Sequence, residues 1–286
     1  MAGNQIENVS DTALWVAVYR AQEGERANPL FKDPLAARLA GARGFEIAKG
    51  VTGPQYTAWS LVIRTVVIDR YIQSAIAAGI DTVVNLGAGL DTRPYRLELP
   101  PELHWIEVDF AHLIQHKETV LAQERPACRL ERISLDLSDR VGRRELFKKI
   151  ASESKRALIL TEGVILYLEN QQVAELAEDL RAHPQFALWI IDYLSKRSLA
   201  FVRKRRKKEL KNAPMVFDPA NWFGFFKERG WKVREIQYLP EVSQMLGRKV
   251  PMPWFARLLS PLMSRKMKDE MRQYLAYALL EHGPRP

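Results

Sequence analysis

The chain has 286 residues, 47% of them hydrophobic and 27% charged, which are the proportions of an ordinary globular protein. No apolar run approaches the roughly 20 residues that a bilayer span needs, and the first residues show no secretion signal. The single cysteine, Cys128, excludes an internal disulfide and has no nearby cluster that suits a metal. We therefore expect a cytoplasmic protein with no membrane span and no bound metal.

The net charge of +9 is concentrated in one stretch, residues 196–211, which we call the basic segment. It contains nine Lys or Arg and one Glu, a local net charge of +8, so the rest of the chain is close to neutral. Phe201 is the only aromatic residue within the run, whereas single-stranded nucleic acids are bound by interleaved aromatic side chains. We favour a solvated helix face or a contact with an acidic ligand over a nucleic-acid partner.

Three helices are predicted before the first strand. The first begins near Ser10 and is broken at Pro29, and the second begins at Asp33-Pro34, where aspartate can cap a helix and proline suits its first turn. The third, Tyr56 to Ala78, has apolar residues at helical spacing and stops at Gly79.

Seven strands are predicted after these helices: Thr82 to Leu86, His104 to Phe110, Arg129 to Leu137, Ala157 to Thr161, Phe186 to Tyr193, Trp231 to Tyr238 and Tyr274 to Leu280. Helical stretches separate most of them, including Pro219 to Arg229, which indicates an α/β fold with a mostly parallel sheet covered on both faces. The apolar stretch Pro240 to Met271 is predicted to be an ordered insertion between the last two strands, against the core or over a site.

No linker divides the chain, so a single domain over residues 1–286 is expected. Its parts would be an N-terminal helical cap (1–80), a cofactor-binding core (81–195), and a third part (196–286) with the basic helix, the last strands and the apolar insertion.

The chemistry begins at Gly87-Ala88-Gly89, directly after the first strand. Glycine has no Cβ, so a turn of this kind lets a ligand approach the backbone closely. The position where a phosphate-binding turn has a third small residue holds Thr92, between Asp91 and Arg93, and this acidic turn suits a pyrophosphate badly. A purely structural turn is the alternative.

Two acidic residues follow at later strand ends. Asp109 lies twenty residues after Gly89 and can accept both hydroxyls of an adenosyl ribose, in a dinucleotide or in S-adenosylmethionine. Asp136 with Leu137 can hold an adenine ring, but Asp136 can equally cap the helix that Ser138-Asp139 opens.

The chain resembles the leucine carboxyl methyltransferase family, in its bacterial branch similar to polyketide O-methyltransferases. The matching stretches are Asn85 to Arg93, Glu107 to Phe110, Asp136-Leu137, Thr161 to Leu168, Arg20 to Glu23, Leu30 to Pro34, Arg64-Thr65 and Ile68-Asp69. The resemblance implies a Rossmann-like class I methyltransferase fold, S-adenosylmethionine as cofactor, and methyl transfer to oxygen.

The resemblance also implies residue roles. Arg64 would meet the methionyl carboxylate of the cofactor, although its place off the apolar stripe also fits a surface arginine. Gly87, with Ala88 and Gly89, would pass close to the methionyl part, Asp109 would hold the ribose, Asp136 and Leu137 the adenine, and Glu162 would face the positively charged end. Tyr167 would orient the acceptor oxygen, unless it is a core tyrosine.

The acceptor is predicted to be a small, polyketide-like carboxylate or acidic hydroxyl, free or on an acidic carrier protein. A carboxylate needs no general base, a phenol does, and none of the five histidines lies in a motif that marks a base. Arg20 or Arg64 would pair with such an anion, so Tyr167 and Arg20 are the candidate catalytic residues. The basic segment and the insertion would form the acceptor's entrance.

Two alternatives remain: a NAD-type oxidoreductase, and an RNA or protein-carboxyl methyltransferase that uses the basic segment to hold its partner.

Overall fold

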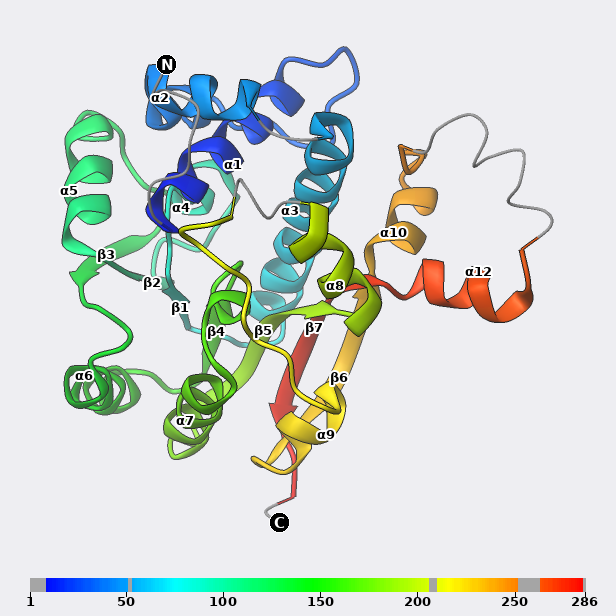
Figure 1. Ribbon diagram of the computed structural model, residues 1–286. Coiled ribbons are helices and arrows are strands. Elements are labelled where there is room, and N and C mark those ends of the chain that lie inside the picture. The colour runs from blue at the N-terminus through cyan, green and yellow to red at the C-terminus, as the bar shows by residue number, and fades with distance from the viewer. Residues whose placement is uncertain (1–8, 51–52, 206–209, 252–262, 285–286) are drawn as a thin grey trace.

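The computed structural model describes residues 9–50, 53–205, 210–251 and 263–284. One seven-stranded sheet runs through the described residues, in the order β3-β2-β1-β4-β5-β7-β6 (Figure 1). Its strands are β1 (Thr82–Leu86), β2 (His104–Asp109), β3 (Arg129–Ser134), β4 (Ala157–Thr161), β5 (Phe186–Leu194), β6 (Trp231–Tyr238) and β7 (Leu275–His282). The seven predicted strands are thus confirmed.

The sheet is mostly parallel, as predicted. Strands β1 to β5 pair in parallel, and β7 is antiparallel to both of its neighbours, β5 and β6. Every residue of β1 is buried, because a central strand covered on both faces has no solvent side. β3 ends at Ser134 rather than at the predicted Leu137, because the Asp136 carboxylate accepts the Ser138 N–H in a turn (2.8 Å).

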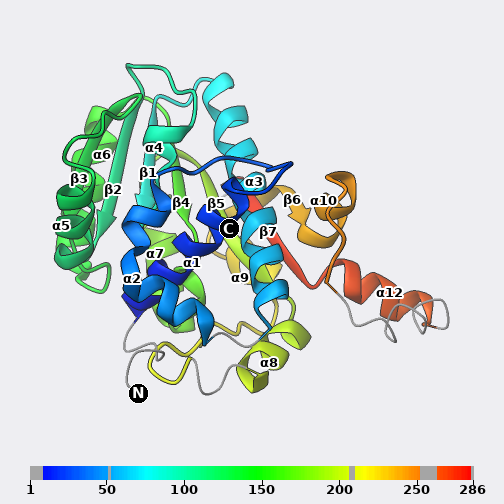
Figure 2. The same ribbon diagram turned by 90° about the horizontal axis from the view of Figure 1, so that it is seen from above.

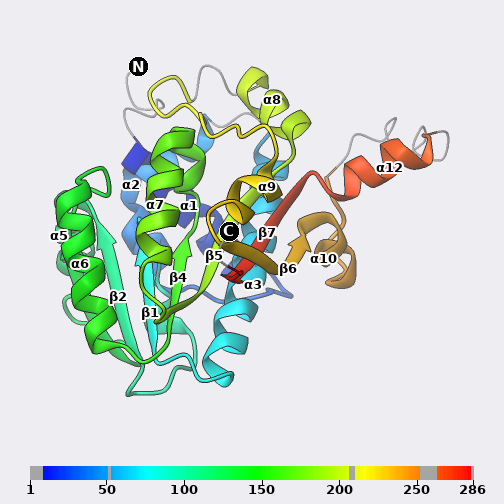
Figure 3. The ribbon, with the colours of Figure 1, turned by 90° about the horizontal axis from the view of Figure 1, so that it is seen from below.

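Helices cover both faces of the sheet (Figure 3). Val84 points to the face covered by α6, α7 and α9, and its neighbour Val83 to the face covered by α3 and α10. The helices are α1 (Val9–Gly24), α2 (Ala36–Lys49), α3 (Pro54–Ala77), α4 (Arg93–Arg96), α5 (Ala111–Val120), α6 (Arg140–Glu153), η1 (Ile165–Tyr167), α7 (Asn170–Arg181), α8 (Lys196–Arg205), α9 (Trp222–Lys227), α10 (Leu239–Met245) and α12 (Arg265–Arg272). None of the described helices is long and apolar enough to cross a membrane.

The N-terminal helices α1 and α2 lie over the edge of the sheet where the parallel strands end (Figures 1 and 2). The prediction that Asp33 caps the second helix is wrong. The helix begins at Ala36 after Leu35, which makes no side-chain cap bond, and the Asp33 carboxylate instead accepts from Arg20 (2.8 Å) and Thr92 (2.7 Å). The Asp33 side chain therefore makes a long-range ion pair instead of the helix cap that the local sequence pattern predicted.

The insertion between β6 and β7 is only partly packed against the core. In α10, Leu239 and Val242 are buried, and Ser243 accepts a hydrogen bond from the indole of Trp59 (2.7 Å). In contrast, α12 buries none of its residues and extends away from the rest of the chain (Figure 1). Residues 252–262 of the insertion lie outside the described part of the chain.

Candidate active site

A cavity of about 390 Å³ opens at the carboxyl ends of the parallel strands, beneath α1 and beside α3. Open α/β sheets hold their ligands at this edge, and the volume lies in the usual range of small-molecule sites. The ten candidate site residues all line it: Arg20, Arg64, Gly87, Ala88, Gly89, Asp109, Asp136, Leu137, Glu162 and Tyr167. Residues separated by up to 147 positions are thus brought together in one place.

The glycine turn forms the floor of the cavity at the end of β1. Gly87 and Gly89 have φ angles of 69° and 49°, which side chains rarely adopt. A Cβ on Gly87 would stand 2.4 Å from Cγ2 of Val164. Glycine is therefore required at position 87 because Val164 packs against it. The space that is open to a ligand lies beside this contact.

Asp109 anchors the turn from the end of β2. Its carboxylate accepts the N–H of Gly89 (2.6 Å) and the N–H of Phe110 (2.7 Å). Burial raises the pKa of Asp109, and the two backbone hydrogen bonds counter part of that rise. Each carboxylate oxygen has a second lone pair, so the group can still accept hydroxyl hydrogens from a ligand in the cavity.

Asp136 and Leu137 line the cavity after β3. The alternative role for Asp136, capping the following helix, is wrong because Asp139 is the cap and accepts the N–H groups of Val141 and Gly142 (3.1 Å each). The Asp136 side chain is exposed and makes the turn with Ser138 instead.

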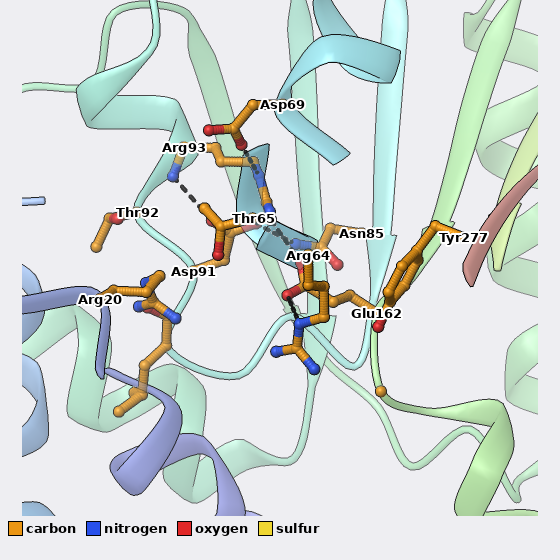
Figure 4. A network of polar contacts seen from close by, with 12 residues as sticks. Arg20, Arg64, Thr65, Asp69, Asn85, Asp91, Thr92, Arg93, Glu162 and Tyr277 are labelled. Carbon is orange, nitrogen blue, oxygen red and sulfur yellow. Dashed lines mark hydrogen bonds and ion pairs between the residues drawn. The ribbon is translucent and has the colours of Figure 1, made fainter. Parts of the chain in front are cut away.

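A buried group of charges lies behind the glycine turn (Figure 4). The Arg93 guanidinium contacts the carboxylates of Asp69 (2.6 Å), Asp91 (2.7 Å) and Glu162 (2.7 Å), and Arg96 also contacts Asp69 (2.7 Å). The acidic residue of the turn thus has a structural role, because the Asp91 carboxylate holds the Arg93 side chain in place.

Glu162 stands between two arginines. Its second oxygen lies 2.7 Å from Nε of Arg64, which reaches in from α3. Burial alone would raise the pKa of Glu162, but Arg93 and Arg64 outweigh it and hold the pKa below its usual range. Arg64 is not on the outer surface, since its side chain is 15% exposed and lines the cavity.

The two candidate catalytic residues occupy different settings. The Arg20 guanidinium bonds Asp33 and donates to the carbonyl oxygen of Leu90 (2.5 Å), so partners within the chain already occupy it. Tyr167 ends the short helix η1 and is half-buried in the cavity wall.

Among the other polar residues that line the cavity are three that were not predicted as site residues: Asn85, Asp192 and Tyr277. Asn85 of β1 is buried, and its amide oxygen has no hydrogen-bond partner among the described residues. Asp192 of β5 accepts the N–H of Gly163 (3.0 Å) and the hydroxyl hydrogen of Tyr277 of β7. The only local signal for Asp192 is a charged residue in an otherwise apolar strand, and Tyr277 has none.

Of the two segments expected at the acceptor's entrance, the basic segment contributes to the cavity lining, whereas none of the described residues of 240–271 does. Ser198 and Val202 of α8 and Leu239 of α10 line the cavity. Arg203 fastens α8 to the chain that follows it, through the Met215 carbonyl oxygen (2.7 Å) and Asp218 (2.9 Å). Residues 206–209 of the basic segment lie outside the described residues.

The five histidines are all described, and none of them lines this cavity. Among the described residues no group of three or more His, Cys, Asp or Glu side chains is placed to hold a metal ion.

Residues 13–181 match the model of the family described as leucine carboxyl methyltransferase. A protein of Frankia alni, named "Putative S-adenosyl-L-methionine-dependent methyltransferase", is 34% identical over 183 residues, which are 60% of this chain and 63% of that protein. The match thus covers less than two thirds of that relative's length. A Mycobacterium bovis protein of the same name is 29% identical over 272 residues, covering 85% of this chain and 82% of the relative.

The arrangement of the chain is also similar to solved structures. The crystal structure of a protein of Thermobifida fusca, described as a putative methyltransferase, is similar with a TM-score of 0.60 and 15% identity, over 97% of this chain and 95% of that one. At this identity the likeness shows the fold, which is that of the Rossmann-like class I methyltransferases.

Proposed function

Because the chain belongs to the leucine carboxyl methyltransferase family, we propose that it transfers the methyl group of S-adenosylmethionine to an oxygen atom of a small acidic acceptor. S-adenosylmethionine is the cofactor of this family. The observation that carries the proposal is the convergence of the glycine turn, Asp109 and Arg64 on one cavity of suitable size.

The residues present fit this cofactor. Asp109 would accept the ribose hydroxyls, Leu137 and Asp136 would border the adenine, and the terminal nitrogens of Arg64 would meet the carboxylate. The unpartnered amide oxygen of Asn85 supports the fit, because a buried acceptor is costly unless a donor such as an ammonium group reaches it.

The bound cofactor supplies a methyl group on a positively charged sulfur. Transfer to oxygen is an in-line displacement, so the chain's task is to align the acceptor oxygen and to exclude water. Tyr167 would orient that oxygen from η1. A carboxylate acceptor arrives ionised and needs no base, and the absence of histidine from this cavity agrees with such an acceptor.

The family match does not favour the NAD-type oxidoreductase. An RNA or protein-carboxyl acceptor would use the basic segment, whose described part, α8, lies at the same end of the sheet as the cavity (Figure 3). We rank it second because the residues that α8 contributes to the cavity lining are Ser198 and Val202, not its cations.

The first test is binding of S-adenosylhomocysteine, followed by thermal unfolding and calorimetry. We expect stabilisation by this nucleoside and none by NADH. Asp109→Ala should weaken binding by roughly 1.5–3 kcal/mol, the range for hydrogen bonds to a charged group. Asp139→Ala is the matched control, since Asp139 is an exposed helix cap outside the cavity lining.

No binding at millimolar nucleoside, or equal binding by the Asp109 variant in its folded form, would contradict the proposal. Where binding is found, transfer from labelled cofactor is then measured across carboxylic acids, phenols, peptides and RNA. The expected products are labelled methyl esters of carboxylic acids or labelled methyl ethers of acidic phenols, with S-adenosylhomocysteine released. Labelled RNA alone would replace our acceptor class with the second candidate.

A further inference from the structure

Asp192 has a buried carboxyl group to which the proposed methyl transfer assigns no role. Its side chain is 1% exposed and lies at the carboxyl end of β5, beside the end of β4 that carries Glu162. Both residues line the cavity. The groups that face Asp192 are the N–H of Gly163, the hydroxyl of Tyr277, and the charges of Arg64 and Glu162.

The charges around the methionyl end of the cavity do not balance. The connected carboxyl groups are Asp69, Asp91, Glu162 and Asp192, and the guanidinium groups are Arg64, Arg93 and Arg96. Arg20 does not supply the missing cation, because it pairs with Asp33. Lys117 does not either, because Lys117 and Arg132 together face two carboxylates, Glu107 and Asp109.

Asp192 is the member of this group without an arginine in direct contact in the described structure. Glu162 touches two guanidinium groups, as does Asp69, and Asp91 touches Arg93. Tyr277 stands beside Glu162 and Arg64 (Figure 4), and its hydroxyl joins Arg64 to Asp192. Burial raises the pKa of Asp192 to about 6, and the bond from Tyr277 and the charge of Arg64 counter part of that rise.

A missing positive charge is what distinguishes the two forms of the cofactor. S-adenosylmethionine and S-adenosylhomocysteine share their ammonium and carboxylate groups, but only the first has a positively charged sulfur. Resting on the proposed function, we propose that Asp192 is a specificity-determining residue whose ionised carboxylate completes the charge balance with S-adenosylmethionine and not with S-adenosylhomocysteine.

The consequence is that binding of S-adenosylmethionine, but not of S-adenosylhomocysteine, releases a proton. Binding of the cation favours the ionised carboxylate, so S-adenosylmethionine should expel a proton from Asp192 near pH 6, whereas the neutral product should not. After methyl transfer the charge is gone, so near pH 6 Asp192 takes back from solvent the proton that it released, whereas well above pH 6 it stays ionised. The same carboxylate therefore favours the fresh cofactor over the spent one above pH 6.

The test is calorimetric titration of the whole chain at pH 6 with each nucleoside, in two buffers of different ionisation enthalpy. We expect release of about 0.4 protons with S-adenosylmethionine, the value for a pKa that falls by one unit from the working pH, and about none with S-adenosylhomocysteine. The preference for S-adenosylmethionine should grow about fivefold between pH 5 and pH 8, since a one-unit fall in pKa is already partly expressed at pH 5. Asp192→Asn should abolish both effects, and Glu235→Gln, at an exposed carboxylate of β6, should keep them.

Equal proton release by the two nucleosides, or release that persists in Asp192→Asn, would overturn the inference. Binding of neither nucleoside would instead refute the proposed function. If Asp192→Asn does not fold, Tyr277→Phe keeps the carboxyl group and removes a bond that lowers its pKa. Its proton release with S-adenosylmethionine should then be greatest at a higher pH than in the unchanged protein, and an unchanged pH would also overturn the inference.

Discussion

At the scale of single residues, Gly87 is under two constraints that one pair of substitutions separates. Gly87→Ala adds a side chain at positive φ, which costs about 1–2 kcal/mol, and forces it into Val164, where overpacking costs about 1–3 kcal/mol. In a Val164→Ala background only the first cost remains, because the clashing Cγ2 atom is gone. Urea unfolding of the four proteins measures the difference.

We expect the two substitutions to be coupled by about 1–3 kcal/mol in the free energy of unfolding, with Gly87→Ala less damaging when Val164 is shortened. Strictly additive costs would show that the backbone conformation alone selects glycine. Activity is no substitute for this measurement, since both residues line the cavity.

Local patterns pointed to residues that line the cavity where a strand end or a glycine turn marks them. Gly87 and Glu162 directly follow a short strand and Asp109 ends one, and parallel strands bring such ends to one edge. Asp192 and Tyr277 were missed for the opposite reason, because their contact depends on which strands become neighbours.

At the scale of elements, α8 forms a wall of the cavity that Arg203 holds in place. Arg203→Ser removes its bonds to Met215 and Asp218, so we expect a Michaelis constant for the acceptor about fivefold higher, corresponding to about 1 kcal/mol. The affinity for S-adenosylhomocysteine should stay within about twofold, since the proposed cofactor contacts lie on other elements.

Lys204→Ser is the matched control, because it removes the same charge from an exposed neighbouring position. If α8 acts by anchoring, only Arg203→Ser changes the Michaelis constant. Equal increases in both variants that vanish at high salt would show that the basic segment attracts the acceptor by its charge instead.

The boundaries of elements could be predicted less well than their existence. The strand predicted to reach Leu137 ends at Ser134, and the helix predicted over Pro219 to Arg229 begins only at Trp222, after Asn221 caps it by accepting the N–H of Gly224. Side chains that bond the backbone stop an element at positions where hydrophobic spacing continues.

At the scale of the whole molecule, the charge of +9 should matter little to the cofactor. Glu162 and the two arginines that hold it, Arg64 and Arg93, are paired and only slightly exposed, so salt screens them weakly. We expect the dissociation constant of S-adenosylhomocysteine to change less than about twofold between about 50 mM and about 300 mM salt. A steep salt dependence by calorimetry would show that the basic segment reaches the cofactor.

We also propose that residues 1–286 act as a single domain. The cavity takes Arg64 from the predicted helical cap, Asp109 from the predicted core and Tyr277 from the last predicted part. None of the three parts holds the whole site.

The position of β7 constrains the order in which the sheet can be completed during synthesis. β6 is made before β7 but pairs only with β7, which enters the sheet between β5 and β6. While the chain emerges from the ribosome, β6 has no partner strand. The edge of β5 that later pairs with β7 stays open until β7 has been made. Since β7 also carries Tyr277, the nascent chain acquires its last strand and the partner of Asp192 in the same event.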